Sequence, residues 1–161
     1  MDPDLISRRH FLLRSSATTL LPLLTGATAN ELLATYHTAT SAARPPGALT
    51  PAQLRVVEAA AERIFPAVDG LPGASAMHVP QFIDAALAGV LADARKTYVE
   101  GIGSLDARSR TMYPKAAGFA ALAEVQQDAV LAAVAATPFF QMLRGHTLVA
   151  CFADPRYGGN F

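Results

Sequence analysis

The sequence contains one cysteine and no tryptophan among its 161 residues. A single cysteine cannot form an internal disulfide, so the folded domain must be stable without a covalent cross-link. Cys151 lies in an apolar run, and we expect a small buried side chain there rather than a reactive thiol. A chain of this length can bury one hydrophobic core but not two. The sequence therefore predicts one domain held together by packing.

The chain also lacks an excess of charge of either sign. Thirteen lysine and arginine residues balance thirteen aspartate and glutamate residues. This balance argues against a nucleic-acid-binding protein and against a polybasic membrane patch. Apolar residues make up 52% of the chain and charged residues only 16%, and alanine is abundant. Such a composition predicts tightly packed helices.

Motifs that hold metals or redox groups are missing as well. The sequence has no Cys-x-x-Cys-His for haem, no Glu-x-x-His for a di-iron bundle and no His-Glu-x-x-His for zinc. The pair Gly101 and Gly103 lacks the third glycine of a dinucleotide fingerprint and follows no predicted strand. His146 and Cys151 lie five residues apart in a predicted helix and so point to different faces. We expect His146 to pack or cap within its helix, and the chain to be no enzyme on its own and to hold no cofactor.

Apolar residues recur at helical spacing, and no stretch alternates for long enough to form a strand. Thr50-Pro51-Ala52-Gln53 predicts a helix start, because a Thr/Gln capping box is followed by proline at the first helical position. Pro66 should end that helix, and the Asp-Gly and Pro-Gly pairs before Val79 predict a loop with a fixed turn.

More helices are predicted further along. Their ranges are Pro80 to Leu91, a continuation or restart from Ala94 to Leu105, Phe119 to Val134, and Pro138 to Ala153. Gly89, Gly101 and Gly103 argue against one straight rod through the first two of these ranges. We therefore predict an all-α fold, a small irregular bundle of four or five helices.

The last predicted helix has clear boundaries. Thr137 can cap it, Pro138 fits its first turn, and Asp154-Pro155 should stop it. The residues that follow are a cation, an aromatic ring, two glycines and an amide: Arg156, Tyr157, Gly158, Gly159 and Asn160. Because glycine readily takes positive φ, we expect an ordered turn that presents side chains for recognition.

The beginning of the chain matches a twin-arginine export signal of the form S-R-R-x-F-L. The residues at its fixed positions are Ser7, Arg8, Arg9, Phe11 and Leu12. An apolar segment runs to about Leu24, and Ala27-Thr28-Ala29 offers a small-residue cleavage site. A basic amphipathic helix is the alternative, but the ordered set of charge, apolar segment and cleavage site favours the signal. The apolar segment is shorter than the roughly 20 residues that a membrane span needs.

This pattern predicts three regions: a signal peptide over residues 1–29, a linker rich in alanine, threonine, serine and proline over 30–48, and a helical domain over 49–161. We expect a periplasmic protein exported by the twin-arginine translocase, attached to the membrane only peripherally.

The helix pattern FFxxLRxxTL, which leads into FADPRYGGN, resembles the C-terminal signature of gluconate 2-dehydrogenase subunit 3. The likeness extends from about Leu49 to Asn160 and includes the Ile-Phe-Pro, Asp-Gly, Pro-Gly-Ala and Val-Pro-x-Phe-Ile-Asp segments. One departure is Val149-Ala150-Cys151-Phe152, where members of the family usually have an acidic residue followed by Gly-Phe-Phe.

The resemblance implies a noncatalytic small subunit that helps to assemble, stabilise and export a flavoprotein. In such complexes the flavoprotein subunit uses FAD to oxidise a sugar or sugar acid, and a cytochrome c subunit carries electrons onward on its haem. The resemblance also suggests partner-binding residues, namely Phe139, Phe140, Arg144, Arg156, Tyr157, Gly158, Gly159 and Asn160.

Two alternatives stay open. One alternative is that the side chains of this region close the domain's own core, an interpretation that we favour for Phe139, Leu143 and Phe152 but not for Arg156 and Tyr157. The protein as a whole could be a stand-alone periplasmic helical ligand-binding protein, which would need an apolar cavity with converging polar groups.

Overall fold

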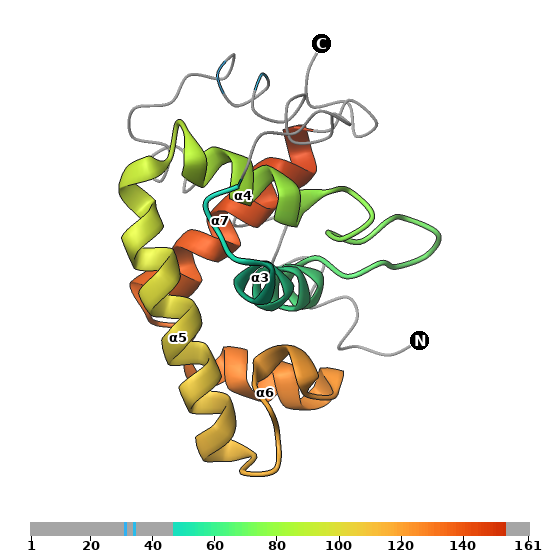
Figure 1. The fold of residues 1–161 in the computed structure, drawn as a ribbon. Helices are drawn as coiled ribbons and strands as arrows, with labels where there is room; N and C mark the ends of the chain where they lie inside the picture. The colour runs from blue at the N-terminus through green and yellow to red at the C-terminus, as the bar shows by residue number, and fades with distance from the viewer. Residues whose placement is uncertain (1–30, 32–33, 35–46, 154–161) are drawn as a thin grey trace.

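A computed structural model describes residues 47–153, together with Glu31 and Ala34. Within residues 47–153 the chain forms five α-helices and two short 3₁₀ helices, which confirms the predicted all-α class (Figure 1). The α-helices are α3 (Pro51–Ile64), α4 (Val79–Ala88), α5 (Arg95–Met112), α6 (Glu124–Ala133) and α7 (Pro138–Ala153). The 3₁₀ helices are η2 (Ala92–Ala94) and η3 (Phe119–Ala121).

Helix α7 packs against three other helices, α3, α4 and α5. Helix α5 forms one side of the bundle, at the left in Figure 1, and α6 lies beside its C-terminal half. The largest fully buried side chains come from every part of this arrangement, and they include Tyr98, Phe82, Phe119, Met77, Ile83, Leu87, Leu105 and Leu143. One continuous apolar core results, and α7 contributes to it although it comes last in the described chain.

The predicted start of α3 is confirmed in detail. The Thr50 backbone N–H donates to Gln53 Oε1 at 2.9 Å, and the Gln53 N–H donates to Thr50 Oγ1 at 3.3 Å. Pro51 occupies the first turn, where its missing N–H leaves no bond unmade. The helix ends at Ile64, directly before the Phe65-Pro66 pair, as the sequence predicts.

The segment that leads into α3 is attached to α4 by a buried carboxylate. Asp84 is only 1% exposed, and its Oδ1 accepts the Leu49 N–H at 2.8 Å. A Cβ atom on Gly47 would overlap this carboxylate, so the chain can pass there only without a side chain. Ala48 and Leu49 are both buried. The packed domain therefore already includes Ala48, the last residue of the predicted linker.

The three glycines that were expected to interrupt a straight helix differ in their effect on the backbone. The predicted break occurs at Gly89, which caps α4, and η2 then leads into α5. Helix α5 runs without interruption through Gly101 and Gly103. At Gly101 the absence of a side chain makes room for the Phe139 ring of α7. Gly103 has no neighbour within 4 Å of where its Cβ would lie.

The prediction of one helix from Phe119 to Val134 is wrong at its start. Phe119 belongs to the 3₁₀ helix η3, and α6 begins only at Glu124. The Phe119 N–H donates to Asp106 Oδ1 of α5 at 2.8 Å, and the ring is fully buried. This tertiary anchor fixes the backbone in a different path from a continuous helix. Val125, in the first turn of α6, is 80% exposed.

Arg63 joins α3 to α6. Its guanidinium makes a forked contact with Asp128, through Nε to Oδ1 at 2.8 Å and Nη2 to Oδ2 at 2.9 Å. Nη1 also donates to Glu124 Oε2 at 2.8 Å. The hydrogen bond with Asp128 is the main cause of a raised pKa for Arg63. Because a bidentate arginine contact is geometrically specific, it sets the position of α6 on α3.

The two glycines of α5 provide a matched test of this packing. Gly101→Ala would place a Cβ against the Phe139 ring and 2.6 Å from the Phe139 Cβ. We expect it to lower the free energy of unfolding by about 1–3 kcal/mol through overpacking. Gly103→Ala meets no neighbour and should raise stability by about 0.5–1 kcal/mol, since alanine favours the helix. Urea denaturation of both variants measures the two signs, and equal shifts would contradict the seating of Phe139 on Gly101.

Candidate partner-binding site

Helix α7 carries the predicted partner-binding residues that the structure describes. It spans Pro138–Ala153, as predicted, and the Phe140 N–H donates to Thr137 Oγ1 at 3.3 Å, which confirms the cap. Most of its described side chains are buried or half-buried, because α3, α4 and α5 pack against it. This helix is therefore first of all a core element, and only parts of it reach the surface.

The structure separates the three described candidates. Phe139 is 7% exposed and lies edge-on to Tyr98, with ring centroids 5.6 Å apart and an angle of 89° between the ring planes. Its place in the domain's own core supports the core interpretation over a contact with a partner. Phe140 and Arg144 are half-buried. Each of these two retains some surface for a partner.

Three further side chains of α7 correct one expectation and confirm two. Phe152 is 44% exposed, so the prediction that it closes the core is wrong. It lies in the last turn of α7, where the helix reaches the edge of the bundle (Figure 1). Leu143 is fully buried, and Cys151 is 1% exposed, as expected for a small buried side chain.

The remaining predicted residues lie outside the described part of the chain. They are Ser7, Arg8, Arg9, Phe11 and Leu12 of the export signal, and Arg156, Tyr157, Gly158, Gly159 and Asn160 of the segment after α7.

His146 forms a buried polar pair with Tyr98 of α5. The Tyr98 hydroxyl lies 2.9 Å from His146 Nδ1, and the two side chains are 0% and 2% exposed. Burial lowers the pKa of His146 to about 4. Burial also raises the pKa of Tyr98 far above its ordinary value. A neutral ring suits this contact in either tautomer, because the tyrosine hydroxyl can donate to Nδ1 or accept from an Nδ1–H. The pair joins α5 to α7, and His146 packs, as predicted.

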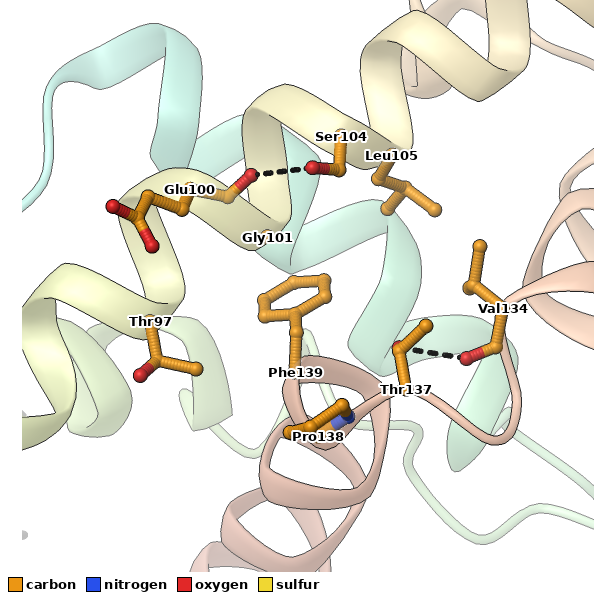
Figure 2. A pocket seen from close by; sticks show the side chains of 9 residues that line it. All are labelled: Thr97, Glu100, Gly101, Ser104, Leu105, Val134, Thr137, Pro138 and Phe139. Carbon is orange, nitrogen blue, oxygen red and sulfur yellow. Dashed lines mark hydrogen bonds between the residues drawn. The ribbon is translucent and has the colours of Figure 1, made fainter.

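A hollow of about 230 Å³ lies between α5 and the start of α7 (Figure 2). The Phe139 ring forms its inner wall beside Gly101, and Pro138 and Val134 line the other side. Two of its three lining hydroxyls already donate to main-chain oxygens, Ser104 to Glu100 at 2.9 Å and Thr137 to Val134 at 2.7 Å. Ligand sites are usually larger, about 300–1,000 Å³, and combine apolar walls with converging polar groups. This hollow does not favour the ligand-binding alternative.

A second hollow, of about 380 Å³, lies between α3 and α6 and is mostly charged. Arg63 lines it, but its guanidinium is already engaged by Asp128 and Glu124. Elsewhere in residues 47–153, no three His, Cys, Asp or Glu side chains gather closely enough to hold a metal ion. None of the helices that the structure describes is long and apolar enough to cross a bilayer.

Sequence reasoning missed two contacts of α7, the one between Tyr98 and His146 and the close approach of Phe139 to Gly101. Neither contact has a local signal, because each joins residues that are about forty positions or more apart in the sequence. The Asp-Gly dipeptide did predict a fixed turn, but the exposed apolar pair on either side of it, Val68 and Leu71, was not identified.

The buried histidine predicts a pH dependence of stability. Because the folded pKa of about 4 lies below the ordinary value of 6.5, the unfolded chain binds a proton at His146 before the folded chain does. The contribution of the neutral, buried His146 to the free energy of unfolding is complete above pH 6.5. It is lost as the pH falls toward 4, by about 3 kcal/mol in all. Denaturant unfolding at pH 7 and pH 4.5 should therefore show a smaller loss for His146→Phe than for the wild type. His78→Asn, at an exposed histidine, is the control and should keep the wild-type loss. Parallel pH profiles for all three proteins would contradict this role of His146.

Comparison with known proteins places this fold in a family. A family model described as gluconate 2-dehydrogenase subunit 3 matches residues 51–161, which include helices α3 to α7 and the segment after them. No curated protein and no solved structure matches the chain. The match covers well over half of the sequence, so the chain belongs to the gluconate 2-dehydrogenase subunit 3 family.

Proposed function

We propose that this protein is the noncatalytic small subunit of a periplasmic, FAD-dependent gluconate 2-dehydrogenase-like complex. The family match over residues 51–161 carries the proposal, because the family is described as a subunit of a dehydrogenase. The geometry agrees with an accessory role. His146 and Tyr98 are shielded from solvent and bonded to each other, so neither is placed to exchange a proton with a substrate.

The chemistry of such a complex belongs to its partner subunits. FAD in a flavoprotein subunit would oxidise the sugar or sugar acid, and haem in a cytochrome c subunit would pass the electrons on. This chain would contribute a surface that helps to assemble and stabilise the flavoprotein. Phe140, Arg144 and Phe152 on α7, followed by Arg156 and Tyr157, would form that surface.

Export completes the proposal. The twin-arginine route accepts folded proteins, so a small subunit bound to a flavoprotein in the cytoplasm could carry it across the membrane. The domain has one continuous core in which the last helix packs against three others. A domain packed in this way would be folded before it is exported.

The export proposal is tested by keeping the charge and changing the side chain. Changing both Arg8 and Arg9 to Lys should retain the protein in the cytoplasm, because a receptor reads the paired arginines rather than their charge. Arg14→Lys, outside the pair, is the control and should be exported normally. Cell fractionation with immunoblotting measures both. Recovery of the double variant in the periplasm at the wild-type level would show that the pair is no such signal.

The docking proposal is tested at the end of the chain. Arg156→Ala combined with Tyr157→Ala should weaken binding to the flavoprotein subunit of the proposed complex by about 2 kcal/mol or more, since arginine and tyrosine are frequent hot spots. The melting temperature should stay nearly unchanged. Arg108→Ala, at an exposed arginine of α5, is the matched control and should bind normally. Co-purification of the two subunits and a thermal melt separate the outcomes. Normal binding with a lowered melting temperature would assign these residues to the domain's own stability.

A further inference from the structure

The loop between α3 and α4 has an exposed apolar tip, formed by residues Ala67 to Leu71. Val68 and Leu71 are 46% and 48% exposed, and they face each other across a two-residue turn. The Val68 N–H donates to the Leu71 oxygen at 3.2 Å, and the Leu71 N–H donates to the Val68 oxygen at 2.9 Å. Asp69 and Gly70 have φ values of 53° and 80°, the pattern of the tight turn that Asp-Gly favours. Figure 1 shows this loop extending away from the helices, at the right.

The base of the loop is fixed to the domain. The Glu62 carboxylate accepts the Ser75 N–H at 2.9 Å and the Ala67 N–H at 3.4 Å, so one side chain holds both sides of the loop. The Ala74 N–H donates to the Phe65 oxygen at 2.9 Å. Ala74 and Met77 are fully buried. With Pro66 and Pro72 on either side of the tip, little conformational entropy remains to be lost when the tip binds.

The apolar character of the tip is not required by the domain itself. Val68 and Leu71 are absent from the apolar core and from the partly buried residues packed against it. Threonine at both positions would suit the same paired backbone, because β-branched residues favour extended pairing. Two neighbouring apolar side chains that are exposed to water on a rigid loop tip therefore indicate a contact outside the domain.

We propose that this tip is a preformed knob that inserts into an apolar hollow on the flavoprotein subunit, an inference that rests on the proposed function. The family match includes residues 66–72, so the tip belongs to the part of the chain that defines the dehydrogenase subunit. A protein hollow suits it better than an anionic membrane, because Asp69 is the only charged side chain of the tip and there is no cation to contact lipid headgroups.

A second copy of this chain suits the tip less well than the flavoprotein. Insertion of a projecting tip into a hollow elsewhere on an identical chain would be a head-to-tail contact, which continues into rings or open filaments. A different subunit accepts one tip and ends the assembly there. The knob therefore provides a contact separate from the residues that follow α7.

Paired substitutions test the knob. Val68→Thr with Leu71→Thr should raise the Kd for the purified flavoprotein subunit at least tenfold and leave the melting temperature within a few degrees of the wild type. Val125→Thr, at an 80% exposed apolar side chain of α6, is the matched control and should keep the wild-type Kd. Tight binding by the wild type with an unchanged Kd for the double variant would overturn the knob but leave the proposed function standing. A wild-type chain that does not bind the flavoprotein at all would overturn both.

Cross-linking gives a second readout that does not depend on the stability of the double variant. A photo-reactive phenylalanine analogue at Leu71, in the full-length chain co-expressed with the flavoprotein, should cross-link to the flavoprotein, whereas the analogue at Val125 should not. Cross-links from position 71 to another copy of this chain would overturn the proposal. Binding of the isolated chain to anionic phospholipid vesicles that is lost in the double variant would overturn it too, in favour of a membrane contact.

Discussion

The fold depends on the close approach of α7 to α5 at Gly101. A side chain on α5 at this position would occupy the space of the Phe139 ring. Without that contact the N-terminal turn of α7 would lie farther from α5, and the Tyr98 hydroxyl and His146 Nδ1, two turns along α7, would lose their 2.9 Å contact. The burial of Leu143 between these two contacts follows from the same approach. A single missing methyl group on α5 therefore allows the last helix to enter the core.

This arrangement divides α7 between two tasks. One face of the helix, from Phe139 to Cys151, is buried in the core, where any change of volume is destabilising. In its last turn Cys151 is still buried, whereas the neighbouring Phe152 is exposed. Residues used for stability and residues available for recognition thus lie on one rigid element. Recognition at its end can change without disturbing the core, provided that the helix itself remains intact.

Features set by neighbouring residues were predictable from the sequence, and features set by distant contacts were not. The capping box at Thr50 and the ends of α3 and α7 depend on residues within one turn, and the structure places them where they were expected. Phe119 fits a helical pattern equally well, but its N–H is taken by Asp106 thirteen residues earlier, so the helix begins later. Phe152 has the spacing of a core residue, yet it is 44% exposed on a turn whose Ala150 and Cys151 are buried, so the packing of the other helices rather than spacing decides its exposure. The partner-binding proposal remains a prediction for Arg156 and Tyr157, which lie outside the described residues.

The contact between Leu49 and Asp84 has a consequence for the order in which the protein folds during synthesis. Leu49 is made first, but the carboxylate that accepts its N–H lies 35 residues later, on α4. Helix α4 in turn packs on α7, which is made after every other described helix. The core on which α4 packs is complete only once α7 has been made. The N-terminal segment, which carries the predicted export motif, is therefore joined to a finished domain only after α7 has left the ribosome.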